Sequence, residues 1–493
     1  MTEIRDHPEP GENADSQQQL VSSPDVGFDS PPPTKRSRLV DPDEELTEAS
    51  ARRKVIDLAI PAVVEQLMIS ILGMIDMIMV GSLGSAAIAS IGLTDQPMML
   101  AMAVFTALNT GVTAVIARLF GSGRIGEAKQ AAKQTLVIVV ALGMVVSVIM
   151  YLAATPILLF MGAQEDTMAY GVRYFELLSL SFTFSVLMMS INSMVRGSGD
   201  TRTPMVNNII GNIVNVICNV FLINGLWFFP ALGVTGAGLS RIISRSLGAI
   251  LALSVVSHHD HPISISWREK FSFDFGLLKN VVTIGIPAAL EQFVMRFGQI
   301  QFVRIVSGLG TDIYAAHQVA LSIFSLSFSP GMGFGMAATT LVGQSLGARR
   351  PDWAEQSTRV TRKTGTWVAG FMGVIFFLFG AQIAWLYAPN DPLVVENAAV
   401  ALKIIAFVQI MQSTQFIYVG ALRGAGDTSW PLYATFIGVW GVRVVFAHLL
   451  VVVFDFGLIG AWLAMSADQC VRWLIVTYRF NSGKWKTART SLS

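Results

Sequence analysis

The chain has 493 residues, of which 53% are hydrophobic and 14% are charged, and its formal net charge is +1. A soluble protein of this length would carry about a quarter charged residues, so the composition argues against a soluble protein and indicates a polytopic membrane protein. The two cysteines, Cys218 and Cys470, lie in apolar segments and offer neither a disulfide framework nor metal-ligand spacing.

Residues 1–50 differ in composition from the rest of the chain. They contain twelve Asp or Glu against four Lys or Arg, with much Ser, Pro and Gln. A segment of this kind cannot bury enough apolar surface to fold alone. It also lacks the apolar core and the cleavage site of a signal peptide. We expect residues 1–50 to form a disordered acidic cytoplasmic tail.

Apolar segments of about 20 residues or more, long enough to cross a bilayer, then recur along the chain. The pattern predicts twelve transmembrane helices. Their expected ranges are 55–81, 87–117, 130–160, 168–195, 202–224 and 233–257 in the first half, and 279–306, 313–343, 364–387, 394–420, 429–454 and 457–480 in the second.

Lys and Arg gather in the loops that follow the second, fourth, sixth, eighth and tenth spans, and they are absent from the loops on the other side. By the positive-inside rule the basic loops face the cytoplasm. The even number of spans places both ends of the chain on that same side. The sequence therefore predicts a multi-pass protein of the plasma membrane with two cytoplasmic termini.

The chain repeats itself at an offset of about 226 residues. IPAVVEQ at residue 60 returns as IPAALEQ at residue 286, and RGSGDT at residue 196 returns as RGAGDT at residue 423. Because six spans were duplicated and six is even, both copies share one topology, and their pseudo-two-fold axis should run along the membrane normal. We expect two pseudo-symmetric six-helix bundles with a cavity between them.

These observations divide the chain into five parts. The expected boundaries are 1–50 for the tail, 51–257 for an N-terminal lobe, 258–277 for a cytoplasmic loop between the lobes, 278–480 for a C-terminal lobe and 481–493 for a cytoplasmic C-terminal tail.

The first span carries two acids, Glu65 and Asp76, within an apolar run. A carboxylate in hydrocarbon costs several kcal/mol, so such residues usually face a bundle interior or a wet cavity. Their spacing of eleven residues places both on one face of a helix. Pro61, one turn before Glu65, tends to bend the helix. We interpret this span as a bent, acid-lined wall of a transport cavity.

Asp76 is the first candidate for ion coupling. Burial raises the pKa of a carboxylate, which suits it to bind and release a proton or another cation during transport. The alternative is an acid that reaches the membrane edge. Asp95 of the second span can match Asp76 in depth, so the two carboxylates could share a proton or Na⁺, although Asp95 is also suited to helix capping. Asn215 and Asn219 share a face of the fifth span and either orient an ion or join helices.

Glu65 and Glu291 are symmetry mates near the middle of the membrane. Their symmetry favours a structural role, such as bonding backbone groups freed by the nearby prolines, over a direct role in transport. Acids other than these two glutamates are expected in the first lobe alone. A difference of this kind between the lobes indicates that the first lobe carries the ion-coupling site. The second lobe is expected to contribute basic groups instead, and Arg296 or Arg443 would either neutralise Glu291 or act as an internal countercharge when the acids are empty.

Several motifs of this chain are characteristic of one family. They are the IPAxxEQ opening, MIDMIMVGSLG at residue 74, ARLFGSG and GQSLGARR after the second and eighth spans, the doubled RGxGDT, NIVNVICNVFLING at residue 212 and GVTGAG at residue 233. As a set, in this order, they resemble the multidrug and toxic compound extrusion (MATE) family of transporters, in its prokaryotic type. The match extends from about residue 55 to residue 480.

The resemblance implies two six-helix bundles and export of organic cations or amphipathic drugs in exchange for H⁺ or Na⁺. It also implies a role in ion coupling for the first-span aspartate, Asp76, where Na⁺ would bind if it is the coupling ion. Two positions depart from the family pattern. Prokaryotic relatives often have Asp where this chain has Asn219. Another branch of the family has an acidic residue in the seventh span near the position of Met295, whereas the acid of this chain, Glu291, lies one turn earlier.

The sequence therefore predicts a secondary active multidrug exporter that works by alternating access. A flippase for lipid-linked saccharides is the alternative within the same superfamily. The chain has no HExxH or P-loop pattern, so neither catalysis nor a bound nucleotide is expected. We expect no cofactor, no structural metal and no nucleic acid, and a monomer that meets small cationic or amphipathic molecules and the lipid bilayer.

Overall fold

The computed structural model describes residues 45, 47–81, 85–163, 165–225, 230–258, 261–265, 273–389 and 391–487. Most of the predicted acidic tail, residues 1–44, lies outside the described residues. The first helix begins at Glu48, inside the range assigned to the tail. Residues 488–493 of the predicted C-terminal tail also lie outside, whereas residues 484–487 form a short 3₁₀ helix whose Trp485 is buried.

Every regular element in the described part of the chain is a helix. The first half contains α1 (Glu48–Gly81), α2 (Ser85–Gly121), α3 (Ile125–Leu152), α4 (Ala154–Phe160), α5 (Glu165–Gly197), α6 (Arg202–Asn224) and α7 (Gly233–Ser257). The second half contains α8 (Phe275–Ser307), α9 (Thr311–Gly347), α10 (Pro351–Tyr387), α11 (Pro392–Ala406), α12 (Gln409–Gly424), α13 (Ser429–Thr435), η1 (Phe436–Val444), α14 (Val445–Ala447), η2 (His448–Val453), α15 (Gly457–Asn481) and η3 (Lys484–Thr487).

The all-helical prediction is confirmed, and the number of spans agrees approximately. Within the described residues, ten helices are long and apolar enough to cross a membrane, and a bent pair, α11 and α12, brings the number to eleven. The remaining long helix, α15, has 25 residues and coincides with the predicted twelfth span. It carries Asp468, Arg472 and Arg479, and it is not among the ten helices that are apolar enough to cross a membrane by composition alone.

Two predicted spans are not single straight helices. The third breaks at Ala153, between α3 and α4, and the tenth bends by 57° between α11 and α12. The eleventh contains two π-helical stretches, η1 and η2. Hydropathy gives the length of an apolar segment but does not indicate where the helix changes direction. The sequence therefore predicted uninterrupted spans.

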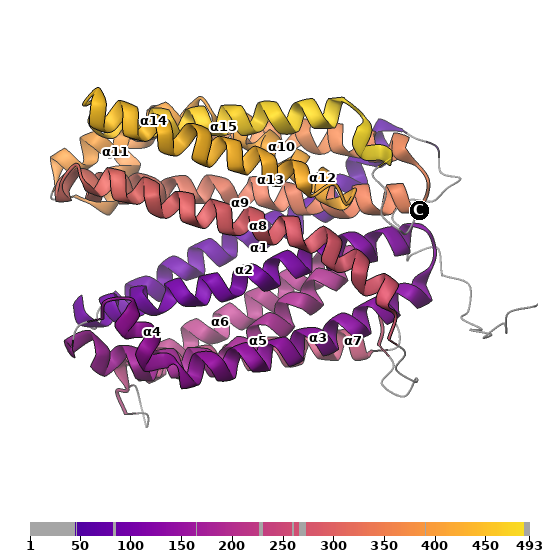
Figure 1. Ribbon diagram of the computed structural model, residues 1–493, viewed down its shortest axis with the longest axis horizontal. Coiled ribbons are helices and arrows are strands. Elements are labelled where there is room, and N and C mark those ends of the chain that lie inside the picture. Colours follow the sequence, from indigo (N-terminus) through magenta and orange to yellow (C-terminus); the bar gives the residue numbers. More distant parts are fainter. Residues whose placement is uncertain are drawn as a thin grey trace, which may run out of the picture.

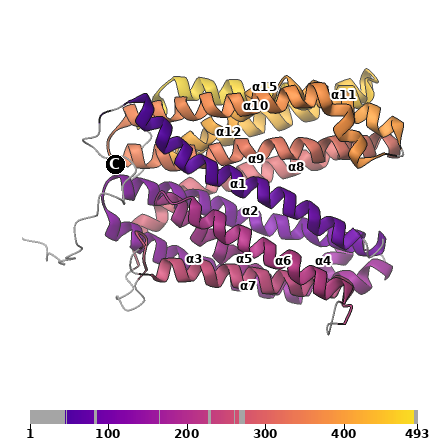
Figure 2. The ribbon, with the colours of Figure 1, turned by 180° about the vertical axis from the view of Figure 1, so that it is seen from behind.

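The helices form two bundles that lie side by side along their lengths, α1–α7 in one and α8–α15 in the other (Figure 1). The first helix of each bundle starts against the opposite bundle. Val55 and Leu58 of α1 belong to a buried apolar cluster with Trp353 of α10, and Figure 2 shows α1 crossing from α10 toward the first bundle. Leu277 and Val281 of α8 are buried with residues of α2 and α3 in the same way. These exchanges tie the two bundles together.

The two bundles touch most closely at the end where the basic loops lie. A side chain at Gly121 of α2 would overlap the carbonyl group of Gln344 in α9, and one at Gly347 of α9 would overlap that of Arg118 in α2. The Gln344 side chain also donates a hydrogen bond of 3.1 Å to the Gly197 carbonyl. Glycine is required here because the helix backbones approach without room for a β-carbon.

Replacing Gly121 by alanine is expected to force the bundles apart at the basic end, because the added methyl group meets backbone atoms that cannot rotate away. Overpacking of this kind costs about 1–3 kcal/mol. Spin labels at Ser122 and Ala348 should report a longer distance in the variant. Gly126→Ala is the control, since nothing lies within 4 Å of a methyl group there. Equal distances in both variants would contradict this account.

Candidate functional site

Two acids of α1 face two asparagines of α6. The Asn208 side chain donates a 2.6 Å hydrogen bond to Glu65, and the Asn219 side chain donates one to Asp76. The acids are eleven residues apart on α1, and the asparagines are eleven apart on α6. The repeated contact shows that the two helices lie parallel and in register, with both acids on one face of α1, as predicted.

An arginine of α7 joins the two aspartates that were expected to match in depth. Arg241 Nη2 lies 3.3 Å from Asp76 Oδ2, and Arg241 Nη1 lies 3.9 Å from Asp95 Oδ1. The Asp76 side chain is 19% exposed and points into the first bundle. We refer to Asp76, Asp95, Asn219 and Arg241 as the Asp76 cluster. Two carboxylates and one guanidinium carry one net negative charge when both acids are ionised.

The asparagines differ in their surroundings. Asn219 uses its amide nitrogen on Asp76, which leaves its buried Oδ1 without a hydrogen-bond partner among the described residues. Asn215 lies one turn earlier on α6, and its buried Nδ2 also has no partner there. A buried polar atom without a partner is costly, so a ligand, ion or water is expected to satisfy it. The described residues contain no group of three or more His, Cys, Asp or Glu placed to hold a metal ion.

The two glutamates form equivalent ion pairs in the two bundles. Glu65 lies 3.0 Å from Arg196, and Glu291 lies 2.8 Å from Arg423. The two arginines open the repeated RGxGDT sequences. The carboxylates were expected to bond backbone freed by the prolines, and Glu291 was expected to pair with Arg296 or Arg443. Both expectations are wrong, because an arginine in the last turn of α5 reaches Glu65 and one in the last turn of α12 reaches Glu291.

A cavity of about 430 Å³ lies against the Glu65 end of α1. Its apolar wall is rich in methionine, from Met98 and Met102 of α2, Met188 and Met189 of α5 and Met336 of α9. Methionine side chains are flexible and polarisable, so they adapt to ligands of different shape. The wall therefore suits a variety of apolar groups rather than one.

The charged residues in this cavity are mostly basic. Arg196, Arg241 and Arg245 line it together with one acid, Glu65. Arg196 is paired with Glu65, and Arg241 is paired with Asp76. No hydrogen bond or ion pair to Arg245 is recorded among the described residues. The first span contributes Glu65 to the wall of this cavity, as predicted, but α7 adds guanidinium groups that the sequence analysis did not include.

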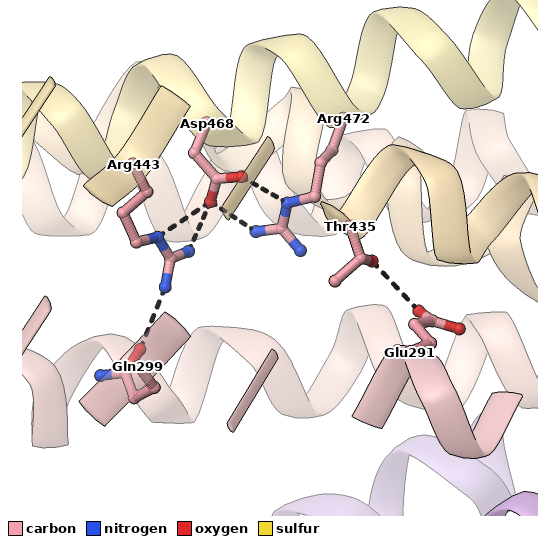
Figure 3. Close-up of polar contacts among 6 residues, drawn as sticks. All are labelled: Glu291, Gln299, Thr435, Arg443, Asp468 and Arg472. Atoms are coloured by element: carbon pink, nitrogen blue, oxygen red, sulfur yellow. Dashed lines mark hydrogen bonds and ion pairs between the residues drawn. The ribbon is translucent and has the colours of Figure 1, made fainter. Parts of the chain in front are cut away.

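The second bundle contains a buried ion cluster of its own, formed by Asp468 and two arginines (Figure 3). Arg443 Nη2 lies 2.5 Å from Asp468 Oδ2, and Arg472 Nε lies 2.8 Å from Asp468 Oδ1. Arg443 also donates a 3.0 Å hydrogen bond to Gln299 of α8. The Asp468 side chain is fully buried and each arginine side chain is 6% exposed.

This cluster corrects the expectation that extra acids occur in the first lobe alone. Asp468 was overlooked, and Arg443 pairs with it rather than with Glu291. Arg443 lies in the π-helical stretch η1, and Gly438 of η1 leaves the space that the Asp468 and Arg472 side chains fill. The cluster links α8, η1 and α15 in the interior of the bundle.

The aspartate of the first RGxGDT sequence begins α6. Asp200 accepts hydrogen bonds from the backbone N–H groups of Arg202 and Thr203 at 2.9 and 3.0 Å. It also lies 3.6 Å from His261 in the segment between the bundles. Burial alone would raise the pKa of Asp200, but His261 and the Thr203 side chain and N–H outweigh it and lower that pKa to about 2.

Replacing Asp200 by asparagine is expected to destabilise the protein at neutral pH by about 1 kcal/mol. The pKa of Asp200 is lower in the folded protein than in the unfolded chain. Its contribution is therefore fully present above about pH 4 and is lost as the pH falls toward 2. Thermal unfolding in detergent at pH 7 and at pH 3 measures the difference. A gap between variant and wild type that stays constant with pH would contradict the assignment.

Arg241, Arg245, Asp468 and Arg472 were not recognised from the sequence. Each lies in an apolar span, so the membrane-insertion cost that identified Asp76 applies equally to them. Arg241 and Arg245 are four residues apart and therefore share one face of α7. That spacing is a visible signal of two cations directed into the bundle.

Comparisons with known proteins match each half of the repeat separately. A family model described as MatE matches residues 61–221 and 287–449. The chain is 31% identical over 458 residues to a probable multidrug resistance protein NorM of Thermotoga maritima, covering 90% of this chain and 95% of the relative. It is 28% identical over 430 residues to the multidrug resistance protein MdtK of Pectobacterium atrosepticum, covering 85% of this chain and 92% of the relative.

Solved structures share the fold. A crystal structure of MATE in complex with MaL6 has a TM-score of 0.83 and 22% sequence identity, covering 88% of this chain and 97% of that chain. An outward-facing conformation of a multidrug resistance MATE family transporter of the MOP superfamily has a TM-score of 0.82 with the same identity and coverage. At this identity the likeness concerns the fold alone.

Proposed function

Because this chain belongs to the MATE family of membrane transporters, we propose that it is a secondary active multidrug exporter that exchanges its substrate for H⁺ or Na⁺. The observation that carries the proposal is the Asp76 cluster, which holds two carboxylates, one guanidinium and an unpartnered amide oxygen inside the first bundle. The methionine-rich cavity, with Arg241 as a shared residue, is the proposed site for organic cations or amphipathic compounds.

In this proposal the coupling cation competes with Arg241 for Asp76. The empty cluster is held by the internal guanidinium, whose charge offsets part of the negative charge of the two acids. A proton on Asp76, or Na⁺ between Asp76 and Asn219 Oδ1, cancels the remaining charge and weakens the hold of the carboxylate on Arg241. The released guanidinium then raises the positive charge of the cavity, which expels a cationic substrate.

Alternating access follows from where the bundles meet. The close glycine contacts lie at the basic end, which we propose to be cytoplasmic by the positive-inside rule. The structure then corresponds to an outward-facing state. Because α1 and α8 each start against the opposite bundle and contain a proline, rocking of the bundles changes the bend of both helices.

The experiment is efflux from proteoliposomes loaded with a cationic dye. A pH gradient and a Na⁺ gradient are imposed separately, and one of them is expected to drive efflux above the rate in vesicles without protein. The same vesicles with both gradients collapsed give the control. Equal efflux with and without any gradient would contradict secondary active transport.

Flipping of lipid-linked saccharides is the second candidate, and Arg245 is the observation that favours it. This guanidinium lines the cavity, and no hydrogen bond or ion pair to it is recorded among the described residues. An unpaired cation in a binding cavity suits a phosphate or carboxylate. Translocation of a diphosphate-linked lipid by vesicles that do not export organic cations would replace the first candidate by the second.

A further inference from the structure

A second hollow lies on the outside of the second bundle, away from the proposed transport site. It has a volume of about 690 Å³ and is lined by the start of α1 and by α10, α12 and α15. Its residues include Glu48, Arg359, Arg362, Lys363 and Trp367. We refer to this hollow as the basic groove. It lies at the same end of the molecule as the basic loops.

The upper wall of the groove is positively charged. Arg359, Arg362 and Lys363 line it, and Glu48 is its acid. Lys363 lies 3.7 Å from Glu48, with both side chains about 70% exposed, and such exposed pairs contribute little. Arg359 contacts Glu355 and is 65% exposed, while no carboxylate within ion-pair distance of Arg362 is recorded among the described residues. The partners of Arg359 and Lys363 are exposed surface carboxylates, so both basic groups remain accessible to an anion in the groove.

The lower wall of the groove is apolar and continues onto the outer face of the bundle. On α10, Arg359, Lys363, Trp367 and Phe371 follow one another at intervals of four residues, so they form one exposed stripe. Trp367 is 76% exposed and Phe371 is 67% exposed. The order from basic to tryptophan to apolar along one helix is typical of the membrane interface.

The dimensions of the stripe fit a phospholipid. Arg359 and Trp367 are eight residues apart, which is about 12 Å along a helix. This distance is similar to that between the phosphate of a phospholipid and the start of its acyl chains. Basic pockets between transmembrane helices on the cytoplasmic side are suited to anionic headgroups. A zwitterionic lipid gains less here, because its cationic group would meet the three bases.

We propose that the basic groove binds an anionic phospholipid, with its phosphate at Arg359, Arg362 and Lys363 and an acyl chain against Trp367 and α12. The groove joins the first residue of α1 to three helices of the second bundle. The bound lipid therefore holds the beginning of α1 against that bundle and stabilises the arrangement in which the bundles are closed at the basic end.

The test is native mass spectrometry of the full chain in detergent, titrated with cardiolipin, phosphatidylglycerol or phosphatidylcholine, with thermal unfolding as a parallel readout. The wild type is expected to bind and be stabilised by the two anionic lipids. The variant with Arg359→Gln, Arg362→Gln and Lys363→Gln is expected to lose affinity for them by about tenfold or more. Arg362→Gln alone should lose part of it.

The matched control removes three exposed basic groups outside the lining of the groove, by Arg53→Gln, Arg124→Gln and Lys279→Gln. It has the same net charge as the groove variant and is expected to bind anionic lipid like the wild type. Equal affinity of the groove and control variants would overturn the proposal. Equal binding of phosphatidylcholine would also overturn it, as would inorganic phosphate that displaces the lipid at equal affinity. If the triple variant fails to fold, Arg362→Gln alone decides the outcome.

Discussion

Replacing Asp76 by asparagine is expected to reduce cation-driven efflux to the leak rate of vesicles without protein. The change removes the carboxylate that contacts both Asn219 and Arg241 and leaves a neutral group of nearly the same size. The cluster then carries no net negative charge when Asp95 is ionised, so H⁺ or Na⁺ has nothing to neutralise. Efflux of a cationic dye from proteoliposomes under the driving gradient is the measurement.

Two further variants sharpen this test. Asp312→Asn removes an exposed acid at the start of α9 and is expected to transport like the wild type. Asp95→Asn is expected to have a smaller effect than Asp76→Asn, because Asp95 lies farther from Arg241 and is more exposed. All three proteins should show the same unfolding temperature in detergent to within a few degrees. Near-normal driven efflux by the Asp76 variant would defeat the assignment.

Replacing Asp468 by asparagine is expected to destabilise the protein by about 3–5 kcal/mol, since it leaves two guanidinium groups buried without their counter-ion. Thermal unfolding in detergent, or the midpoint of a denaturant titration, measures this loss. Expression and monodispersity should fall in parallel. Within the part of the chain that the structure describes, Asp468 is the one carboxylate that pairs with two almost fully buried arginines, so its removal is expected to have a larger effect than that of any other single charge there.

The control for this prediction is an exposed ion pair. Glu127→Gln removes the partner of Arg124, with both side chains 43% exposed, and should cost well under about 1 kcal/mol. Replacing Arg443, Asp468 and Arg472 together by apolar residues of similar volume should be much less harmful than removing Asp468 alone, because no buried charge is left unpaired. A mild effect of Asp468→Asn would show that the arginines find other partners or water.

Much of the fold was predictable because the bilayer imposes a length on every span and the duplication repeats it. The ranges of α6, α7 and α15 agree with the predicted spans to within a residue or two. The break at Ala153 has a signal that hydropathy does not register, because Pro156 cannot donate to the carbonyl group of Leu152, where α3 ends. The bend between α11 and α12 lies in continuous apolar sequence and was not predictable.

The crossing of α1 and α8 to the opposite bundle was also not visible in the sequence. The pattern of repeats shows that two units exist, but it contains no information about which unit a given apolar face meets. Val55 and Val281 read as ordinary core residues, and only the three-dimensional arrangement shows that their cores belong to the other half of the chain.

Within the candidate site, the acids were predictable and their partners were not. Helical spacing correctly placed Glu65 and Asp76 on one face, and the structure sets Asn219 beside Asp76. The bridging residue, Arg241, was missed because basic residues were counted as indicators of orientation rather than as buried charges. The pairing of Glu65 with Arg196 was missed because RGSGDT was used only as evidence of the repeat, although its arginine lies in the last turn of α5 and reaches inward.

The most direct measurement of coupling is cation release on substrate binding by the purified protein in weakly buffered detergent solution. When a cationic dye binds, the wild type is expected to release protons, or bound Na⁺ if that ion is used, because dye and cation exclude each other. Asp76→Asn should bind the dye without releasing either. Release by the Asp76→Asn variant equal to that of the wild type would contradict the role assigned to this carboxylate.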